Sequence, residues 1–343
     1  VAFGISWNGD LFFHAGGRFF QRDFHAVLHI RALVIRLTRT AATAVLMVAT
    51  FMDLMDSTIT NVALPTIGKD LNATPEQLEW TLAGYVIAFA TLLITGGRLG
   101  DIFGHRRIFV IGMVGFTLAS LGAALSQTGD LLVAARVIQG AFAGIMVPQV
   151  LSSVQVMFAP EERAPVLGII GALSSLGAIG GLILGGWLVT ADLLGMGWRS
   201  IFLVNVPVGV MLVAAALLFV PRSRSEHPLR PDLVGVLLGG LGVFLVVFPL
   251  TDGRAAGWAW WIWAMLTTAP FVIAAFVWQQ RRMLKAHGSP LLPLPLFRDR
   301  GFASGQLVQV LSSIGNGGYV LILLYYVQSA LGFTALAAGL TLL

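Results

Sequence analysis

Long apolar segments recur along the chain, each with the length typical of a membrane-spanning helix. A helix needs about 20 mostly apolar residues to cross the hydrocarbon core of a bilayer. Nine segments meet this requirement, near residues 41–63, 79–96, 108–126, 131–156, 164–189, 200–220, 232–251, 258–280 and 302–327. They are too long for the strands of an outer-membrane barrel and lack the alternation of apolar and polar residues that such strands show. The pattern therefore predicts an all-α transmembrane fold.

The two ends of the chain depart from this pattern. Residues 1–38 mix Phe, His, Arg and Gly without the charged-then-apolar order of a signal peptide, so we predict no fold for this N-terminal extension. Residues 335–343 read as the beginning of a tenth span, but so short a helix cannot cross about 30 Å of hydrocarbon. We therefore expect the chain to be truncated at its C-terminal end.

Composition narrows the class of protein. Hydrophobic residues make up 57% of the 343 positions and charged residues only 11%, which is far from the balance of a soluble domain. The chain has no cysteine, which excludes disulfides, thiolate metal sites and cysteine nucleophiles. None of the six histidines lies in the middle of a predicted span, which argues against metal transport and against a membrane-embedded enzyme. We predict that the protein is not an enzyme and holds no cofactor or metal.

The basic residues predict the orientation in the membrane. They lie between apolar segments and not on a soluble face, so the pI of about 10.2 does not indicate a nucleic-acid partner. Cytoplasmic loops carry the excess of Lys and Arg. With the N-terminus in the cytoplasm, all but four of the 21 Lys and Arg residues fall in cytoplasmic segments, the exceptions being Lys69, Arg136, Arg199 and Arg254. We therefore expect a multi-pass protein of the inner (plasma) membrane, surrounded by the lipid bilayer.

Two carboxylates lie inside the first predicted span. Asp53 and Asp56 are three residues apart and so share one face of a helix. An ionised carboxylate at mid-membrane costs roughly 2.5–3.5 kcal/mol, so such groups usually line a cavity, form a pair or carry protons. Burial and a like-charged neighbour both favour the neutral form of a carboxyl group, which would let one of the two exchange protons near neutral pH. The alternative is that an acid only braces the helix packing.

Arg136 and Gln139 in the fourth predicted span are the expected partners of these acids. At about 1.5 Å per residue, Asp56 lies roughly 10 Å and Arg136 roughly 8 Å below the outer ends of their helices. Gln139, one turn deeper, falls nearer the level of Asp53. We therefore expect the four residues to share a central cavity. The alternative is that Arg136 extends outward to the lipid headgroups.

Glycine patterns mark the fifth span and one inner loop. In the fifth span, Gly177, Gly181 and Gly185 recur at every fourth residue, and Gly186 extends the smooth surface. Such a face allows another helix to approach closely, and a mechanical role in transport is the further hypothesis. The short loop after the second span places an acid and two arginines among glycines, in the order Gly97, Gly100, Asp101, Gly104, Arg106 and Arg107. Anchoring at the inner membrane surface explains the arginines but not the acid.

Several short segments between residues 51 and 209 then match the motifs of one family in order and spacing. They are LMDSTITNVALP at 54–65, GRLGDIFGHRR at 97–107, RVIQG at 136–140, the glycine-rich stretch 177–186, WR at 198–199 and NVPVG at 205–209. Together they resemble the fourteen-spanner drug/proton antiporters of the major facilitator superfamily, which are multidrug efflux permeases. The chain departs from the family pattern at Leu182, where proline is usual, and at Ser200, where an aromatic residue is common.

The resemblance implies roles and boundaries. It implies that Asp56 and Arg136 act in proton coupling, and that Asp101, Arg106 and Arg107 form a charge network that stabilises one access state. It also implies an N-terminal six-helix bundle at 39–221, an inserted two-helix segment at 222–284 and the incomplete start of a C-terminal bundle at 285–343.

These observations together predict a secondary active transporter. It would export small lipophilic or cationic compounds, with protons as the coupling ion, and any accessory efflux proteins stay unassigned. Two alternatives with the same fold are a metabolite exporter and a proton-coupled importer. A structural or sensory membrane protein is a third.

Overall fold

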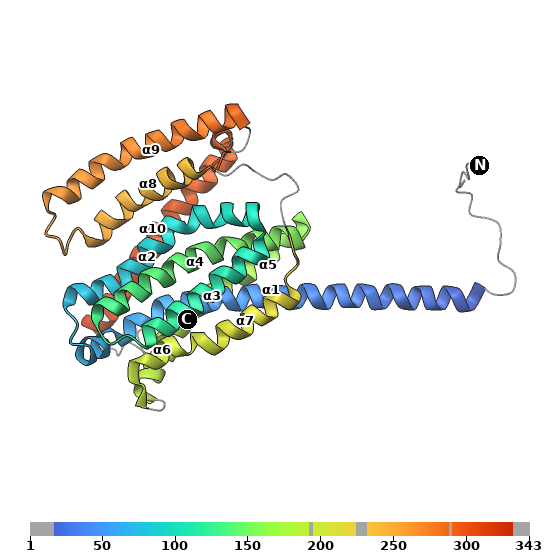
Figure 1. The fold of residues 1–343 in the computed structure, drawn as a ribbon, viewed down its shortest axis with the longest axis horizontal. Coiled ribbons are helices and arrows are strands. Elements are labelled where there is room, and N and C mark those ends of the chain that lie inside the picture. Colours follow the sequence, from blue (N-terminus) through green and yellow to red (C-terminus); the bar gives the residue numbers. More distant parts are fainter. Residues whose placement is uncertain (1–16, 192–194, 224–231, 288–289, 332–343) are drawn as a thin grey trace.

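The computed structural model describes residues 17–191, 195–223, 232–287 and 290–331, and these residues form helices and connecting turns without strands (Figure 1). The long helices are α1 (Gly17–Asp70), α2 (Pro75–Phe103), α3 (His105–Ala124), α4 (Gly129–Met157), α5 (Pro160–Ala191), α7 (Asn205–Phe219), α8 (Leu233–Asp252), α9 (Trp260–His287) and α10 (Arg300–Ser329). The short ones are α6 (Ser200–Leu203) and the 3-10 helices η2 (Gly197–Arg199) and η3 (Leu294–Arg298). The all-α prediction is confirmed.

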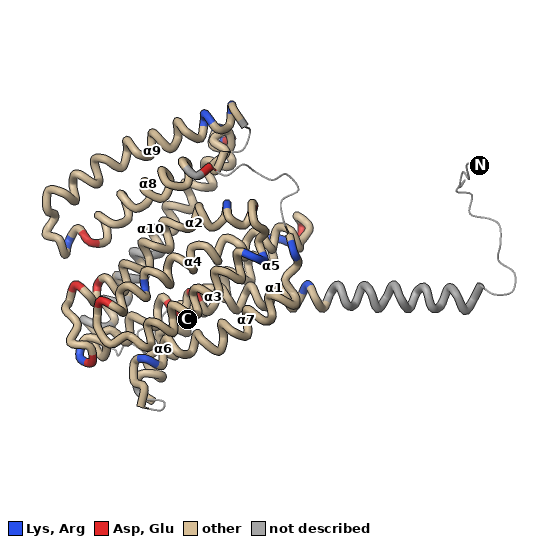
Figure 2. Tube along the Cα trace, in the orientation of Figure 1, with Lys and Arg blue, Asp and Glu red and all other residues tan. Residues whose placement is uncertain are grey.

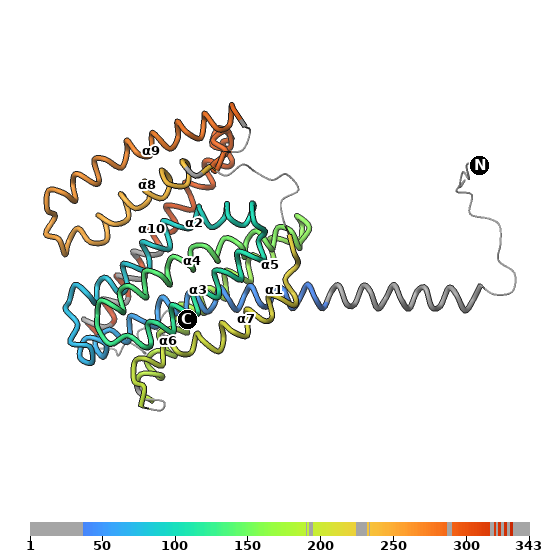
Figure 3. The backbone as a smooth tube through the Cα atoms, viewed as in Figure 1, coloured from blue at the N-terminus to red at the C-terminus, as the bar shows by residue number. Residues whose placement is uncertain are grey.

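The predicted spans coincide with helices. Among the described residues, eight helical stretches are long and apolar enough to cross a membrane, and α10 covers the ninth predicted segment. The backbone runs back and forth between the two ends of the bundle, as the tube in Figure 3 shows. The predicted tenth span at 335–343 lies outside the described residues.

Two elements differ in detail from what the sequence suggested. The sixth span is confirmed as one candidate membrane span, Gly197–Phe219, but a turn at Val204 divides it, since α6 ends at Leu203 and α7 begins at Asn205. Pro207 lacks an N–H group and its ring would clash with the carbonyl of Leu203, four residues earlier, so the regular hydrogen bonding is interrupted there. Residues 17–38, for which we predicted no fold, belong to α1. They contain no proline and no glycine beyond Gly17, so nothing in them stops a helix that the first span has begun.

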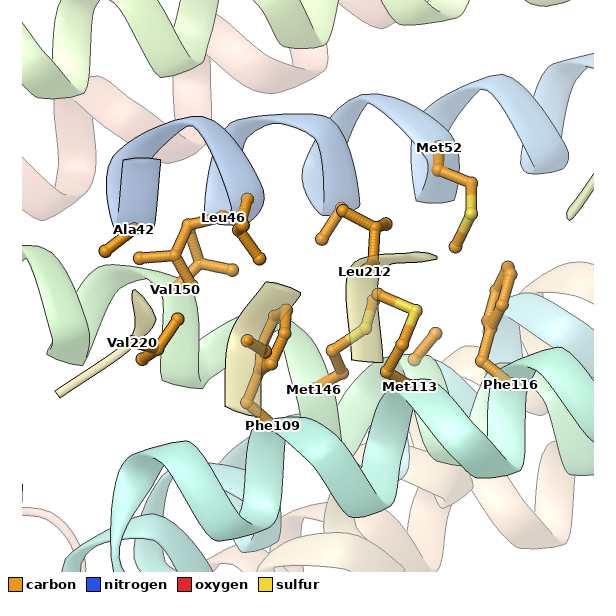
Figure 4. Packing of buried hydrophobic residues seen from close by; sticks show 14 of the residues in the cluster. Ala42, Leu46, Met52, Phe109, Met113, Phe116, Met146, Val150, Leu212 and Val220 are labelled. Atoms are coloured by element: carbon orange, nitrogen blue, oxygen red, sulfur yellow. The ribbon is translucent and has the colours of Figure 1, made fainter. Parts of the chain in front are cut away.

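Helices α1 to α7 form a bundle, and α8 and α9 pair with each other alongside α2 (Figure 1). Buried apolar side chains from α1, α3, α4 and α7 meet inside the bundle, among them Leu46, Phe109, Met146 and Leu212 (Figure 4). A second buried cluster around Trp198 and Phe202 lies at the other end of the bundle. Because lipid is as apolar as these side chains, their close packing and not their removal from water holds the helices together. The predicted unit limits at 39–221, 222–284 and 285–343 stay predictions.

Glycines allow α2 and α4 to touch. A Cβ atom on Gly96 would lie 2.5 Å from the carbonyl oxygen of Gly144, and a Cβ on Gly140 would overlap the carbonyl of Tyr85. Without these glycines the two backbones would be forced apart. We made no prediction of this contact, although Gly140 and Gly144 are four residues apart and so share one face of α4.

The predicted glycine face of α5 packs against α1. A Cβ on Gly177 would lie 3.0 Å from the carbonyl oxygen of Phe51, and one on Gly185 would lie 2.7 Å from Ile59. Gly181 is held equally close to the backbone of α1. Gly186 does not extend this surface, since nothing lies within 4 Å of its Cβ position. One residue turns a helix by about 100°, which takes Gly186 off the packed face.

Replacing Gly181 with alanine is expected to destabilise the bundle, whereas the same change at Gly171 is not. The added methyl group at Gly181 would overlap Thr58 and the carbonyl of Met55, while nothing lies within 4 Å of the corresponding position at Gly171. Overpacking of this kind costs typically about 1–3 kcal/mol. The measurement is thermal unfolding of the two purified variants in the same detergent. Equal melting temperatures would show that α5 does not depend on this contact.

Apart from Asp53, Asp56 and Arg136, most charged residues lie near the ends of the helices (Figure 2). Most Lys and Arg residues lie at the end where α1 enters the bundle, whereas acidic residues occur at both ends (Figure 2). This polarity agrees with the predicted loop pattern.

Candidate functional site

A fully buried carboxylate lies at the centre of the bundle. Asp56 on α1 accepts a hydrogen bond from Arg136 Nη1 at 2.6 Å on one oxygen and from Gln139 Nε2 at 2.9 Å on the other. Asn205, at the start of α7, donates to the same oxygen as Gln139. Three helices therefore converge on one acid, and its ionised form is matched by a guanidinium and two amide donors.

Hydrogen bonds and two aromatic rings hold the side chain of Arg136 in place. Its Nη1 also donates to Gln139 Oε1 at 2.7 Å, and its Nε donates to the carbonyl of Thr81 on α2 at 3.1 Å. The guanidinium lies 4.3 Å from the ring centre of Tyr85 and 5.7 Å from that of Phe202, within range of cation–π attraction. The side chain is 1% exposed. The alternative in which Arg136 extends to the lipid headgroups is therefore wrong.

Asp53 has a different environment. It accepts a hydrogen bond of 2.5 Å from the hydroxyl of Tyr85, and among the described residues it forms no ion pair. Its exposed fraction is 6%. The ring of Tyr85 lies over Arg136, so this one side chain stands between Asp53 and the guanidinium. Two acids on the same helix face thus differ in what neutralises them.

The four predicted residues are brought together, but they do not line an open cavity. Asp56 and Gln139 have no exposed surface at all. Tyr85, Ser120 and Asn205 fill the space around them, and Ser120 on α3 accepts a hydrogen bond from Gln139 Nε2 at 2.7 Å. The expected central cavity is replaced by a closed, packed polar cluster.

Three members of the cluster were missing from the predicted set of residues. Tyr85, Ser120 and Asn205 were not assigned to it, although Asn205 belongs to a quoted motif. Their common signal is polarity inside an apolar span. A depth estimate like the one that paired Asp56 with Arg136 would bring Ser120 and Asn205 to a similar level of the membrane.

The inner loop forms a tight turn between α2 and α3. Gly104 has a φ angle of 97°, a left-handed conformation that favours glycine, and α3 begins at the next residue. His105 Nδ1 lies 3.0 Å from Gln149 Oε1 on α4, and Gln149 Nε2 donates to the carbonyl of Gly96 at 2.6 Å. Gly100 leaves the space that Gln149 and His105 occupy. The glycines therefore let α2, α3 and α4 lock together at this end.

The expected charge network of this loop is not formed directly. Asp101 contacts His105, with 3.7 Å between Oδ1 and Nε2, and the described ion pairs include none between Asp101 and Arg106 or Arg107. Arg106 instead donates to the carbonyl of Val220 at the end of α7, at 3.2 Å. The turn at Gly104 carries both arginines onto α3 and away from the acid. Gly97 is not tightly packed, since its Cβ would lie 3.8 Å from Pro148.

The chain is similar to a known protein family and to several known transporters. Residues 46–343 match the family model described as Major Facilitator Superfamily. The chain is 40% identical over 306 residues to a "Probable actinorhodin transporter" of Streptomyces coelicolor, covering 89% of this chain and 53% of that protein.

Two further relatives show the same pattern. An uncharacterized MFS-type transporter of Mycobacterium tuberculosis is 38% identical over 84% of this chain and 48% of its own length. The "Tetracenomycin C resistance and export protein" of Streptomyces glaucescens is 33% identical, over 88% of this chain and 54% of its own length. The chain thus spans about half the length of these relatives.

Proposed function

The chain belongs to the major facilitator superfamily, and from that premise we propose that it serves proton-coupled export of small lipophilic or cationic compounds across the cytoplasmic membrane. Its apolar helices make it a multi-pass membrane protein. Relatives whose names describe export of, or resistance to, tetracenomycin C, puromycin and cephamycin support a role in efflux. The basic helix ends support an orientation with the N-terminus in the cytoplasm.

The observation that carries the proposal is the unequal pairing of the two buried acids. An unpaired ionised carboxylate inside a membrane is costly, whereas a pair of opposite charges with further hydrogen bonds is tolerated. Asp56 has such a partner in Arg136, and Gln139 and Asn205 satisfy the rest of its hydrogen-bonding capacity. Asp53 has only the neutral hydroxyl of Tyr85. In the proposal, Asp56 stays ionised as part of the cluster, and Asp53 is the group that takes up and releases the proton.

Tyr85 gives this proton a means of acting on the rest of the site. Its hydroxyl donates to Asp53 while its ring lies against Arg136. Protonation of Asp53 removes a negative charge next to this unit and takes away the acceptor that the hydroxyl prefers. Any shift of Tyr85 then changes the packing around Arg136, and so the contact of α1 with α2 and α4.

The lack of an ion-pair partner for Asp53 favours a cationic substrate. When Asp53 is ionised and accessible, a cationic compound and a proton compete for one carboxylate. Release of the cation on one side of the membrane and binding of a proton there would then occur as one exchange. This coupling moves the cation out as the proton moves in.

The test is transport by the full-length protein reconstituted in liposomes, with ethidium as a lipophilic cation. We expect an imposed proton gradient to drive ethidium against its concentration gradient, and ethidium addition to release protons in return. A protonophore should abolish both effects. Ethidium movement that is unchanged by the protonophore would contradict proton coupling, and movement in the same direction as the protons would indicate an importer.

A further inference from the structure

A pocket lies at the basic end of the bundle, away from the buried acids. It is a cavity of about 590 Å³ where α2 ends, α3 begins and α7 ends. Its polar lining is dominated by Arg106, Arg107 and Arg222, and its apolar lining includes Phe103, Ile111 and Leu217. No carboxylate is among the described residues that line it.

Among the described residues, no carboxylate compensates the positive charge of the three arginines in this pocket. Arg106 is held in place by its hydrogen bond to the carbonyl of Val220. Arg107 and Arg222 are exposed and form no hydrogen bond or ion pair with other described residues. Like charges gathered around one pocket, from the start of α3 and from the segment after α7, repel each other, and an anion placed among them removes that repulsion. Guanidinium groups bind phosphate oxygens through two parallel hydrogen bonds, so phosphate is the anion that suits them best.

The start of α3 adds to the positive electrostatic potential in this pocket. Its N-cap is Gly104, which has no side chain to accept a hydrogen bond from the first turn. The His105 N–H donates to the carbonyl of Ser223 at 3.2 Å, so the later N–H groups of that turn and the positive end of the helix dipole are what favour an anion here. This effect supports the arginines and does not by itself define a site.

The apolar wall of the pocket indicates an amphiphilic ligand. Phe103, Ile111 and Leu217 are 52%, 45% and 49% exposed, so the pocket opens onto the surface that faces lipid. The exposed apolar side chains continue along α3 through Val114 and Leu118, toward the middle of the membrane. A free phosphate ion would use the arginines and leave this wall unused. The preference for basic residues on the cytoplasmic side accounts for the arginines but not for their joining an open apolar slot.

We propose that this cavity binds an anionic phospholipid of the cytoplasmic leaflet, with its phosphate among Arg106, Arg107 and Arg222 and an acyl chain along Ile111 and Leu217. Basic pockets between spanning helices on the cytoplasmic side are suited to such headgroups. The bound lipid joins the α2–α3 turn to the end of α7. It therefore stabilises the same contact that Arg106 makes with Val220.

The experiment uses the full-length protein, stripped of lipid, and measures binding of phosphatidylglycerol by native mass spectrometry. Phosphatidylcholine with the same acyl chains and inorganic phosphate are the comparison ligands. We expect Arg107→Gln with Arg222→Gln to weaken phosphatidylglycerol binding roughly 10- to 30-fold, because each arginine near an anionic surface contributes roughly fivefold. Arg254→Gln removes the same charge at the opposite end of the bundle and serves as the matched control.

The outcomes separate the possible ligands. Phosphatidylglycerol bound more tightly than phosphatidylcholine in the parent and in Arg254→Gln, but not in the double variant, is the expected result. Leu217→Ser, made in the parent, should also weaken phosphatidylglycerol binding, and it should leave the binding of inorganic phosphate unaffected. Equal binding of both lipids would overturn the proposal, as would displacement of phosphatidylglycerol by millimolar inorganic phosphate, which would identify a phosphate site. Transport activity does not enter this test, so its result is independent of the proposed proton coupling.

Discussion

Replacing Arg136 with leucine is expected to lower the free energy of unfolding by about 3–5 kcal/mol, the cost of leaving a buried charge without its partner. Asp56 would keep its two amide donors but lose the guanidinium, and it has no exposed surface through which water could compensate. The carbonyl of Thr81 and the ring of Tyr85 would also lose the contacts that Arg136 now makes. Thermal unfolding of the purified full-length variant in detergent measures the effect.

Two further variants identify the cause of that loss. Adding Asp56→Asn to Arg136→Leu removes the stranded charge, so we expect the double variant to recover much of the stability. Arg136→Lys keeps the charge but cannot reach Asp56, Gln139 and Thr81 together, because lysine lacks the planar fork of arginine. Its stability should fall between those of the parent and Arg136→Leu. If Arg136→Leu unfolds at the same temperature as the parent, the ion pair does not hold this cluster together.

The sequence was sufficient to predict the helices and the pairing of Asp56 with Arg136. The helices follow from the length of apolar segments, which the bilayer imposes on any spanning chain. The pairing follows from depth alone, because both residues occupy known helices at similar distances from the outer ends. Neither inference requires knowing how each helix is rotated about its own axis relative to its neighbours.

Features that depend on helix rotation could not be predicted in this way. The hydroxyl of Tyr85 bonds Asp53, and the ring of the same residue covers Arg136. Which face of α2 turns toward α1 is set by its close contact with α4, where Gly96 of α2 meets Gly144 and Gly140 of α4 meets Tyr85. The four-residue spacing of Gly140 and Gly144 marks the packed face of α4, but it does not say which helix packs there. For the same reason depth alone predicted a cavity where the structure has a closed cluster.

The turn at Gly104 shows a related limit. The family resemblance implied a charge network of Asp101, Arg106 and Arg107, which are also close in sequence. The left-handed conformation of Gly104 redirects the chain within one residue, so Arg106 bonds the end of α7 while the acid faces His105. Closeness in sequence across a tight turn is therefore a poor guide to pairing.

Asp53→Asn is expected to abolish uphill transport while leaving the fold intact. Asparagine has nearly the shape of the acid and its oxygen can still accept the hydrogen bond from Tyr85, but it cannot bind and release a proton. Ethidium should still equilibrate across liposomes that contain the variant, yet an imposed proton gradient should no longer drive its accumulation. The pH dependence of the remaining transport should flatten for the same reason. Asp252→Asn, at the outer end of α8, removes an acid away from the cluster and should behave like the parent.

Comparison with Asp56→Asn decides which acid carries the proton. Asp56 holds Arg136 directly, so its replacement leaves the guanidinium buried without a carboxylate and should destabilise the protein as well as impair transport. Asp53 makes no such contact, so its replacement should separate coupling from stability. If Asp53→Asn accumulates ethidium as well as the parent while Asp56→Asn does not, the proton resides on Asp56. The ion pair with Arg136 would then have to open in each transport cycle, and the closed cluster seen here would be one of two alternating states.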